Sequence, residues 1–358
     1  MELFPLAENP LPEGGIVSVV STRDRLHLRA AHWLAGTGCA GTVAIFPGHT
    51  EFIEKYSEVI HELLSRNFDV AILDWRGQGA SSRLAKNPRK GHVGNFRAFG
   101  EDIRAFTEQV LQPFCRPPWF ALGHSMGGAI LLEMAHAGRL PFARLVLSAP
   151  MIQLQGMRIA GAKRLAVKAL TLLGQGRRFV PGGGGPDPSL QFAGNILTSD
   201  AARHGRCVRI LEALPELTIS GPTIGWVNAA FHLMRRFEDP AYARRITIPT
   251  LIVAPGNDRL VDAVATEDFA SRLKAGKCIT LPGARHEILM ERDIYRQRFW
   301  AAFDAFLPGQ SGADLGPRDA RGFAAAKLTP SQRSQLTEPP FAQGISEIRG
   351  SRLGDFDM

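Results

Sequence analysis

The feature that most constrains the fold of this chain is an alternation of short apolar runs with stretches of helical periodicity. The runs have the length and β-branched composition of strands, and several end in glycine-containing loops. They lie at residues 17–21, 26–33, 42–46, 68–73, 119–122 and 144–148, and again at 250–254 and 278–281. The first two runs are close enough to form a hairpin, whereas helix-length segments separate most of the later ones. This order predicts an α/β fold with a mostly parallel central sheet flanked by helices.

The alternation is interrupted once. Residues 152–240 are helix-like, basic and glycine-rich, which predicts an insertion between a first part of the core at 15–151 and a second part at 241–307. The glycine run inside this insertion indicates a flexible loop, because no Gly-Lys-Ser/Thr follows it to cradle a phosphate. Residues 308–358 are rich in Gly, Pro, Ser, Gln and Arg and have too few apolar groups to bury, so we expect a disordered tail.

One glycine-rich loop carries the pattern G-x-S-x-G, as Gly-His-Ser-Met-Gly at residues 123–127. An apolar run precedes this loop, and a helix of small and apolar residues is expected after it. A serine on a sharp strand-to-helix turn needs neighbours without bulk, and glycine on both sides meets that need. A glycine-rich protein can carry the bare pattern by chance, but the flanking strand and helix favour Ser125 as a nucleophile.

Ser125 needs a histidine to take its proton and a carboxylate to orient that histidine. Asp258 and His286 follow Ser125 in an order known for such triads, and each stands in a loop after an apolar run. The chain holds 10 histidines, so a surface histidine is the competing interpretation of His286. Asp262, four residues after Asp258, is the alternative acid, although its position favours the start of a helix.

The negatively charged oxygen of a tetrahedral intermediate needs two backbone N–H donors. One is expected from Met126, directly after the nucleophile, and the other from His49, in the Pro-Gly-His-Thr loop after the third apolar run. Asp74 and Arg76 belong to the glycine-rich loop after the fourth run. We expect this pair to hold that loop in place.

Composition narrows the partners. With 358 residues, 45% of them hydrophobic, the chain can bury a full core, and its net charge of +8 favours anionic partners. The four cysteines form no C-x-x-C pair, which predicts reduced thiols in a cytosol and neither a metal site nor a cofactor. The net charge is the only feature that favours nucleic-acid binding, and no recognised motif supports it, so no nucleic-acid partner is expected. The N-terminus does not have the pattern of a signal peptide, and no apolar stretch reaches the roughly 20 residues of a spanning helix, so we expect a cytoplasmic protein.

Together these residues resemble the lysophospholipase and monoacylglycerol lipase branch of the α/β-hydrolase superfamily, within the serine aminopeptidase-like hydrolases. The segments that carry the resemblance are FPGHTEFIEKY at 46–56, DWRGQGASSR at 74–83, GHSMGG at 123–128, PGNDRLVD at 255–262 and GARHEILMERD at 283–293. The last of these, and GPTIGWVNAA at 221–230, look more like bacterial lysophospholipases than eukaryotic monoacylglycerol lipases. The resemblance implies the α/β-hydrolase fold, the same triad, and backbone donors at His49 and Met126. Many relatives have His-Gly where this chain has Pro47-Gly48. The resemblance therefore carries over the backbone donor of that loop but not the contacts that support the loop.

The insertion stands where this family has a helical cap, or lid, that covers the active site and shapes acyl-chain selectivity. Within it, Lys163, Arg164 and Lys168 share a helix-like stretch with several leucines. This basic amphipathic pattern is suited to an anionic membrane surface. A cap helix packed on the core, with a solvated basic face, is the alternative.

The sequence therefore predicts a serine carboxylic-ester hydrolase that acts on lysophospholipids or monoacylglycerols through an acyl-enzyme intermediate. Its expected partners are a small-molecule lipid ester and, peripherally, the inner face of an anionic membrane, while the oligomeric state stays open. A serine aminopeptidase-type amide hydrolase is one alternative, but the basic insertion argues against a site for a free amino terminus. A non-catalytic membrane- or protein-binding module is the other, and the intact triad argues against it.

Overall fold

The central element of the structure is a mostly parallel β-sheet. The computed structural model describes residues 1–156, 161–184 and 190–307. Within these residues the sheet has eight strands, in the order β1-β2-β4-β3-β5-β6-β7-β8. The strands are β1 (Ile16–Ser21), β2 (His27–Trp33), β3 (Thr42–Phe46), β4 (Asp69–Leu73), β5 (Trp119–His124), β6 (Arg144–Ser148), β7 (Thr250–Pro255) and β8 (Gly276–Leu281). Every expected strand is present, with bounds that differ by a residue or two at most.

The strand directions place three loops at one edge of the sheet. β1 and β2 form the expected antiparallel hairpin, and β2 also runs antiparallel to β4. From β4 across to β8 each neighbouring pair is parallel, with Val43 of β3 opposite Val70 of β4. The loops after β5, β7 and β8 therefore leave the sheet at the same edge, the usual place for a site in a fold of this kind. These loops carry Ser125, Asp258 and His286.

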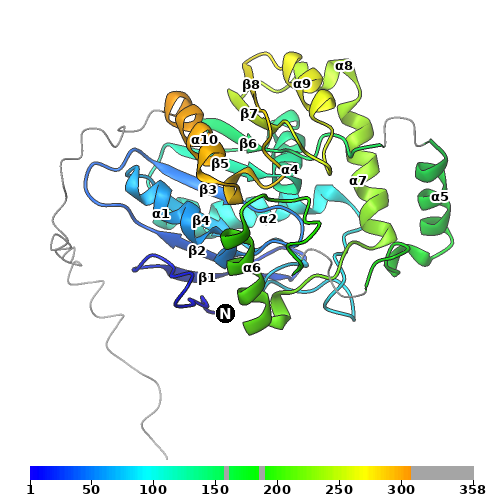
Figure 1. Ribbon diagram of the computed structural model, residues 1–358, viewed down its shortest axis with the longest axis horizontal. Coiled ribbons are helices and arrows are strands. Elements are labelled where there is room, and N and C mark those ends of the chain that lie inside the picture. Colours follow the sequence, from blue (N-terminus) through cyan, green and yellow to red (C-terminus); the bar gives the residue numbers. More distant parts are fainter. Residues whose placement is uncertain (157–160, 185–189, 308–358) are drawn as a thin grey trace, which may run out of the picture. The chain divides into compact units, whose positions relative to one another are not determined.

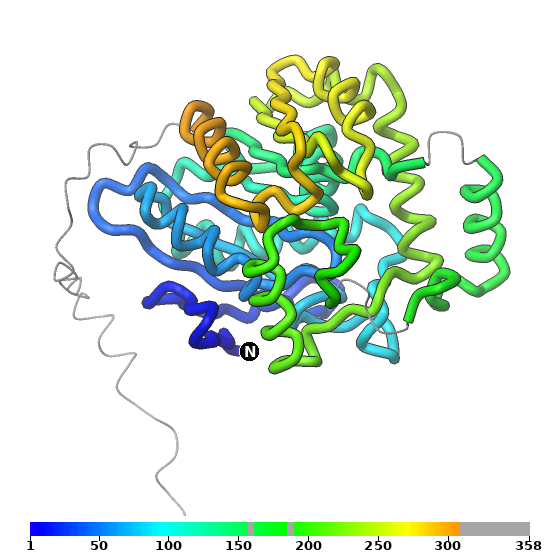
Figure 2. Tube along the Cα trace, viewed as in Figure 1, coloured from blue at the N-terminus to red at the C-terminus, as the bar shows by residue number. Residues whose placement is uncertain are grey.

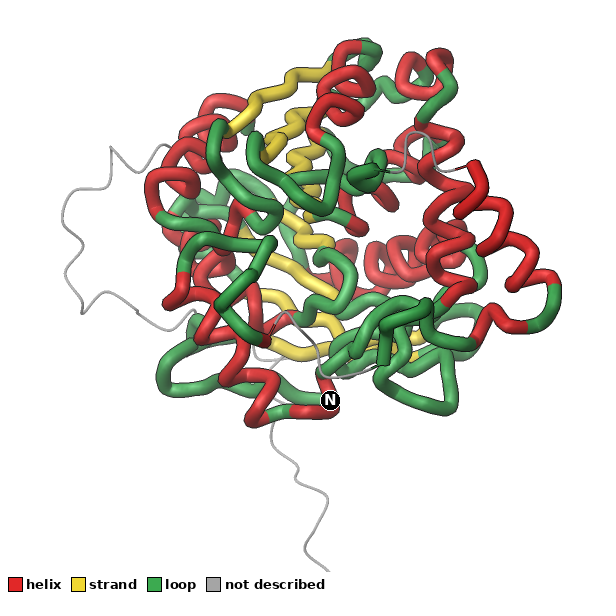
Figure 3. The backbone as a smooth tube through the Cα atoms, turned by 45° about the vertical axis from the view of Figure 1, so that its right-hand side comes forward, coloured by secondary structure: helices red, strands yellow, loops and turns green. Residues whose placement is uncertain are grey.

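Helices cover both faces of the sheet, as Figures 1 and 3 show. Val43 and Ile45 of β3 belong to a hydrophobic cluster shared with α1 and α10, whereas Ala44 and Phe46 belong to one shared with α2, α4 and α9. Because strands buried on both faces read as continuous apolar runs, this packing explains the pattern in the sequence. It confirms the expected α/β class. The α-helices are α1 (Ser57–Ser65), α2 (Phe99–Phe106), α3 (Gln112–Phe114), α4 (Met126–His136), α5 (Gly161–Leu172), α6 (Ala201–Ala213), α7 (Ile224–Phe237), α8 (Pro240–Arg244), α9 (Ala263–Ser271) and α10 (Asp293–Phe306).

The chain between β6 and β7 forms α5, α6, α7 and α8, and these helices differ in how they attach to the rest of the molecule. α7 packs into the core through side chains such as Trp226 and Phe237. α6 is tied to α1 by an ion pair of 2.6 Å between Arg203 and Glu58. α5 has no buried residue and lies at the right-hand edge of Figure 2. The expected insertion at 152–240 encloses α5, α6 and α7, and its role as a cap stays a prediction.

Two expectations concern the limits of the fold. The expected disordered tail at 308–358 lies outside the described residues. Within the described ranges, no helix combines the length and the apolar character needed to cross a membrane.

Candidate active site

Ser125 stands on a strained turn between β5 and α4. Its backbone has φ +48° and ψ −111°, a conformation that a residue with a side chain rarely adopts. A Cβ on Gly127 would lie 2.1 Å from the carbonyl oxygen of Phe46, and a Cβ on Gly123 would lie 2.7 Å from a methyl carbon of Leu131. Both contacts are too close for any side chain. The glycines of the motif are therefore required by close packing, and the turn presents Ser125 at the sheet edge.

The structure brings Ser125, Asp258 and His286 together in one chain of hydrogen bonds. His286 Nδ1 lies 2.7 Å from Asp258 Oδ2, and His286 Nε2 lies 3.0 Å from Ser125 Oγ. Because an ionised carboxylate can only accept, Nδ1 carries the proton and Nε2 is left to accept from the serine hydroxyl. Each of the three residues is more than nine-tenths buried, at 7%, 7% and 3% exposure respectively. The competing interpretation of His286 as a surface histidine is therefore wrong.

Asp258 is held as an ionised acceptor. Its Oδ1 accepts hydrogen bonds from the amides of Leu260, at 2.7 Å, and Val261, at 3.0 Å, which leaves Oδ2 for His286. Burial acts to raise the pKa of Asp258, but the bonds from His286 and from the two amides hold that pKa below its usual value. An acid in this state can orient a histidine and stabilise its cation.

The alternative acid, Asp262, has a different role. It is the N-cap of α9, and its carboxylate accepts a hydrogen bond of 3.0 Å from the amide of Ala265. A capping carboxylate satisfies an amide that has no partner within the helix. The expected helix-start position of Asp262 is confirmed.

The two expected amide donors lie on adjoining segments. Met126 is the first residue of α4, so its amide has no acceptor within the helix. The loop that carries His49 follows β3 and crosses over the start of α4, because a Cβ on Gly127 would also lie 2.6 Å from the carbonyl oxygen of Pro47. The segments that would supply the two donors are thus in contact beside Ser125.

The support of the loop at residues 47–50 comes from the loop after β4. Gln78 accepts a hydrogen bond of 2.6 Å from the Thr50 amide and donates one of 3.3 Å to the Gly48 carbonyl. Trp75 donates from its ring nitrogen to the Pro47 carbonyl at 2.8 Å. Side chains of the glycine-rich loop after β4 therefore support the segment that contains Pro47-Gly48.

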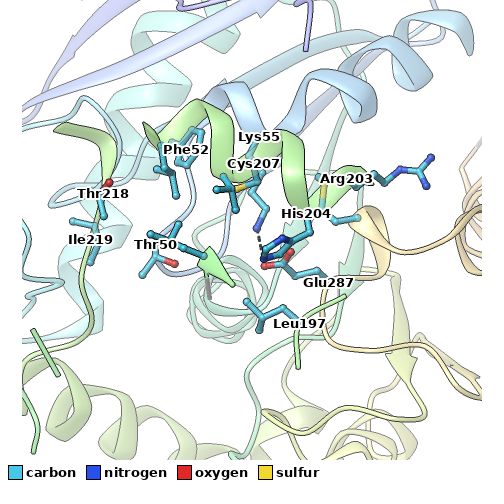
Figure 4. A pocket seen from close by; sticks show the side chains of 14 residues that line it. Thr50, Phe52, Lys55, Leu197, Arg203, His204, Cys207, Thr218, Ile219 and Glu287 are labelled. Carbon is cyan, nitrogen blue, oxygen red and sulfur yellow. Dashed lines mark hydrogen bonds and ion pairs between the residues drawn. The ribbon is translucent and has the colours of Figure 1, made fainter. Parts of the chain in front are cut away.

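A buried ionic chain, not anticipated from the sequence, links the same loop to the histidine loop. Glu51 accepts hydrogen bonds from the Gly48 amide and, at 2.6 Å, from the Tyr56 hydroxyl. Lys55 Nζ lies 2.8 Å from the Glu51 carboxylate. It also lies 2.7 Å from the carboxylate of Glu287, the residue directly after His286 (Figure 4). The four-residue spacing of Glu51 and Lys55 was the available signal. Nothing local pointed to Glu287.

The electrostatics of this chain are balanced by mutual contact. Burial acts to raise the pKa of Glu51, but the adjacent Lys55 ammonium holds it at about 2. Burial acts to lower the pKa of Lys55, and the two carboxylates together raise it above its usual value. Glu51 and Lys55 are therefore both charged near neutral pH, and removing one of them leaves an uncompensated charge in the interior.

Asp74 holds the glycine-rich loop, as expected, and pairs with an arginine of β2. Its carboxylate pairs with Arg29 at 2.8 Å and accepts a bond of 2.8 Å from the Ala80 amide. Arg76 instead pairs with Asp102, at 2.7 Å. Both residues thus hold the loop as expected, each through a partner from another element, Arg29 of β2 and Asp102 of α2.

The side chain of His49 connects the site to α7. Its ring lies 4.3 Å, between centroids, from the ring of Trp226. Burial, against the opposing effect of Glu51, lowers the pKa of His49 to about 4, so the ring is neutral near neutral pH. A helix of the expected insertion thus packs directly on the loop that would supply one oxyanion donor.

A cavity of about 50 Å³ lies between α6 and the catalytic loops. Thr50, which follows His49, and Glu287, which follows His286, line one side, and Leu211 and Cys207 of α6 are among the residues on the other (Figure 4). This volume holds water molecules but not a long acyl chain. Among the described residues, no three His, Cys, Asp or Glu side chains are grouped as a metal site.

Comparisons with known proteins show the family of the chain. Residues 38–293 match the family model described as serine aminopeptidase, S33. The chain is 34% identical over 269 residues to lysophospholipase L2 of Escherichia coli, covering 71% of this chain and 76% of that protein. It is 26% identical over 270 residues to a monoacylglycerol lipase of Mycolicibacterium smegmatis, covering 72% and 85% of the two chains.

Solved structures show the same fold. A soluble variant of monoglyceride lipase from Saccharomyces cerevisiae matches with a TM-score of 0.66 at 20% identity, over 85% of this chain and 99% of that one. The expected fold and family are confirmed. The chain, with its serine, histidine and aspartate joined at one edge of a mostly parallel sheet, belongs to the serine aminopeptidase S33 family of α/β-hydrolases, in the branch of the lysophospholipases and monoacylglycerol lipases.

Proposed function

We propose that this chain hydrolyses the carboxylic ester of lysophospholipids or monoacylglycerols, with Ser125 as nucleophile, His286 as base and Asp258 as the residue that orients His286. The observation that carries the proposal is the unbroken relay from Ser125 Oγ through His286 to Asp258, with contacts of 3.0 and 2.7 Å. A serine hydroxyl in such a relay is activated for acyl transfer.

The chemistry has two halves. In the first, His286 Nε2 takes the proton of Ser125 as Oγ attacks the ester carbonyl, and the protonated histidine then gives that proton to the departing alcohol. In the second, His286 takes a proton from water, and the resulting attack on the acyl-enzyme releases the fatty acid and restores Ser125. The amides of His49 and Met126 donate to the negatively charged oxygen in both halves. Asp258 stays ionised throughout, which its lowered pKa supports.

The substrate class is supported by the relatives. Their names, lysophospholipase and monoacylglycerol lipase, both describe hydrolysis of esters with a single acyl chain. The enzyme class inferred for this chain is accordingly a carboxylic-ester hydrolase. The cavity beside the catalytic loops measures about 50 Å³, which is too small for a long acyl chain.

The segment at 152–240 is proposed to be the cap. Two contacts support this role, because α7 packs Trp226 against His49 and α6 lines the cavity next to Glu287. Part of the cap is also proposed to contact an anionic membrane at its inner face. α5 exposes Leu165 and Leu172, at 68% and 77%, together with basic side chains, and such a surface binds a lipid interface.

The test compares the parent enzyme with Ser125→Ala against lysophospholipids, monoacylglycerols, short esters and aminoacyl amides. We expect hydrolysis of the single-chain lipid esters to exceed that of the amides, and loss of all of it in Ser125→Ala. Ser65→Ala, at an exposed position in α1, is the matched control. Preferred cleavage of the amides would favour an aminopeptidase-type activity. A folded protein whose Ser125 does not react with a fluorophosphonate probe would instead favour a binding module.

A further inference from the structure

A groove with a positive lining lies beside the acid and the base of the triad. It has a volume of about 540 Å³ and is lined by the segment 192–196 and by Ser199, Asn257, Arg259 and Arg285. Arg259 directly follows Asp258, and Arg285 directly precedes His286. None of the lining residues carries a carboxylate, whereas both arginines carry a positive charge.

The two arginines have no counter-ion among the described residues. The side chain of Arg259 is exposed and has no hydrogen bond or ion pair within the described part of the chain. Arg285 donates from Nη1 to the carbonyl oxygens of Asn195, at 2.6 Å, and Thr198, at 2.8 Å. These acceptors orient Arg285 but do not neutralise its charge. The groove is therefore prepared for an anion.

Asn195 provides a second, independent observation. Its side chain is buried, at 7% exposure, and its Oδ1 accepts a hydrogen bond of 2.6 Å from the amide of Leu197. Its Nδ2 is buried and has no hydrogen-bond partner among the residues that the structure describes. Because a buried N–H group without an acceptor is costly, such a group calls for a partner that the protein does not itself supply.

Glu291 supports the wall of the groove. Glu291 is fully buried, and its carboxylate accepts bonds from the amides of Ser199, Arg285 and Arg292, at 3.0, 3.0 and 2.9 Å. It also accepts from the Ser199 hydroxyl at 2.5 Å. Its oxygens are thus occupied by groups that hold the groove's backbone in place.

We propose that this groove binds a phosphate group, with Arg259, Arg285 and Asn195 Nδ2 as the donors. A guanidinium offers paired N–H donors that match the oxygens of a phosphate. A phosphate has enough acceptor oxygens to serve both arginines and the amide at once. The phosphate belongs either to the head group of a lipid substrate, which rests on the proposed function, or to a free phosphate ion, which does not.

The experiment measures binding without turnover. The full chain carrying Ser125→Ala is titrated calorimetrically with inorganic phosphate and with glycerophosphocholine, and with glycerol as the probe without phosphate. We expect both phosphate probes to bind and glycerol to give no heat. Arg259→Gln and Asn195→Asp should each raise the dissociation constant for phosphate by about tenfold or more. Asn195→Asp keeps the acceptor for the Leu197 amide and replaces the Nδ2 donor by a negatively charged acceptor, with little change in shape.

Arg298→Gln is the matched control, since it removes the same charge from an exposed position on α10. It should leave phosphate binding unchanged. Equal phosphate affinity in the parent, Arg259→Gln and Asn195→Asp would overturn the proposal, and so would a parent that binds neither phosphate probe. Because Arg259 is exposed, its substitution keeps the test valid even if Asn195→Asp does not fold.

Two kinetic measurements distinguish the sources, using enzyme with Ser125 intact. If the head group occupies the groove, Arg259→Gln lowers kcat/KM for a lysophospholipid about tenfold and leaves that for the matching monoacylglycerol unchanged. If free phosphate is the ligand, Arg259→Gln loses phosphate binding. The ratio of kcat/KM for the lysophospholipid to kcat/KM for the monoacylglycerol is then the same in the parent enzyme and in Arg259→Gln. An enzyme without lipid-ester activity that still shows the arginine-dependent binding would reject the proposed function and support the site.

Discussion

The catalytic loops and α5 differ in how tightly the fold holds their side chains. Ser125, Asp258 and His286 come from three separate loops, yet each is more than nine-tenths buried and hydrogen-bonded to the next. α5 is one continuous helix, yet it buries no residue and leaves Leu172 exposed at 77%. Residues distant in sequence are thus held tightly, whereas neighbours in sequence are held loosely.

The difference follows from what each region is proposed to do. Acyl transfer needs its groups held at hydrogen-bond distance before the substrate arrives, because small displacements reduce the rate strongly. A surface that meets a lipid interface needs exposed apolar groups, which cannot also be used for internal packing. α6 lies between the two extremes: its Arg203 is tied to Glu58 of α1, although little of the helix is buried. We therefore expect substitutions in the catalytic loops, in α5 and at the contact of α6 with α1 to change different properties of the protein.

The largest effect is expected from Asp258→Asn, which should lower kcat on a soluble short ester by roughly 10⁴-fold. Asparagine can no longer stabilise the histidine cation and favours the wrong tautomer of His286. Binding to anionic vesicles should not change. Steady-state kinetics and vesicle sedimentation measure the two properties on the same preparation.

The control for that change is Asp262→Asn, an identical substitution four residues away. Asp262 caps α9, and asparagine is as good a cap as aspartate, so activity and stability should both stay close to those of the parent. If Asp262→Asn were the variant that lost activity and Asp258→Asn were not, the assignment of the acid would be wrong.

A second effect is expected from Lys55→Met, which removes the cation shared by Glu51 and Glu287. The released carboxylates should disturb both loops, so we expect kcat to fall about 100-fold, with a smaller change in KM. Lys55→Arg retains the charge and should recover part of the activity. Measuring kcat and KM separately distinguishes misplaced catalytic groups from weaker substrate binding.

Lys86→Met, at an exposed position, is the control for loss of a lysine. Its kinetics should match those of the parent. Melting temperatures of all three variants show whether each remains folded. Normal kcat in a folded Lys55→Met protein would mean that the buried ionic chain has no part in positioning the catalytic loops.

A third, smaller effect is expected from Leu172→Asp in α5. Replacing an exposed leucine by an acid should weaken binding to anionic vesicles about tenfold, through lost apolar burial and added repulsion. The kcat/KM on a soluble ester should not change. Leu34→Asp places the same substitution on another exposed leucine, which is 55% exposed and outside the insertion, and should leave vesicle binding as it is. Equal vesicle binding by Leu172→Asp and the parent would remove α5 from the proposed membrane surface.

The smallest effect is expected from Glu58→Gln, which weakens the attachment of α6. Burial acts to raise the pKa of Glu58, but the bond from Arg203 and the charge of Arg296 hold it at about 2. Because the folded pKa is lowered, Glu58 contributes stability above its ordinary pKa and loses it as the pH falls from about 4.5 towards 2. Given its partial exposure, we expect a loss of about 1 kcal/mol near neutral pH.

Urea unfolding near neutral pH and near pH 4 measures this effect. The difference in the free energy of unfolding between the parent and Glu58→Gln should be smaller at the lower pH. Glu212→Gln, on the exposed face of α6, should show no gap at either pH. A gap that widened as the pH fell would contradict the sign of the pKa shift.

The fold and the central triad could be predicted because both depend on local patterns. Strands buried on both faces must be apolar throughout, and a serine on a tight turn must have glycine neighbours, so each leaves a mark within a few residues. Chain order and the rule that parallel strands end at one edge then suffice to bring Asp258 and His286 to Ser125. The same local signal located the N-cap at Asp262, where the helix start is defined by its own residues.

The supporting contacts could not be predicted, because they join segments that have no relation in sequence. Lys55 and Glu287 stand 232 residues apart, and nothing near either one indicates the other. Asp74 was expected to hold its own loop, but its partner Arg29, 45 residues earlier in β2, was not predicted. Sequence spacing favours neighbours, but side-chain direction decides which ions meet.

The sequence by itself determined the class of fold, the family and the positions of the proposed nucleophile and base, since backbone conformation and strand burial limit which residues can occupy each position. Only the tertiary structure decided how the catalytic loops are held. It placed Glu51, Lys55 and Glu287 in one buried chain, and among the described residues it left Arg259 and Arg285, beside the triad, without an ion-paired carboxylate. The reason is physical: the energy of a buried charge depends on what surrounds it in space, and that arrangement exists only once the chain has folded.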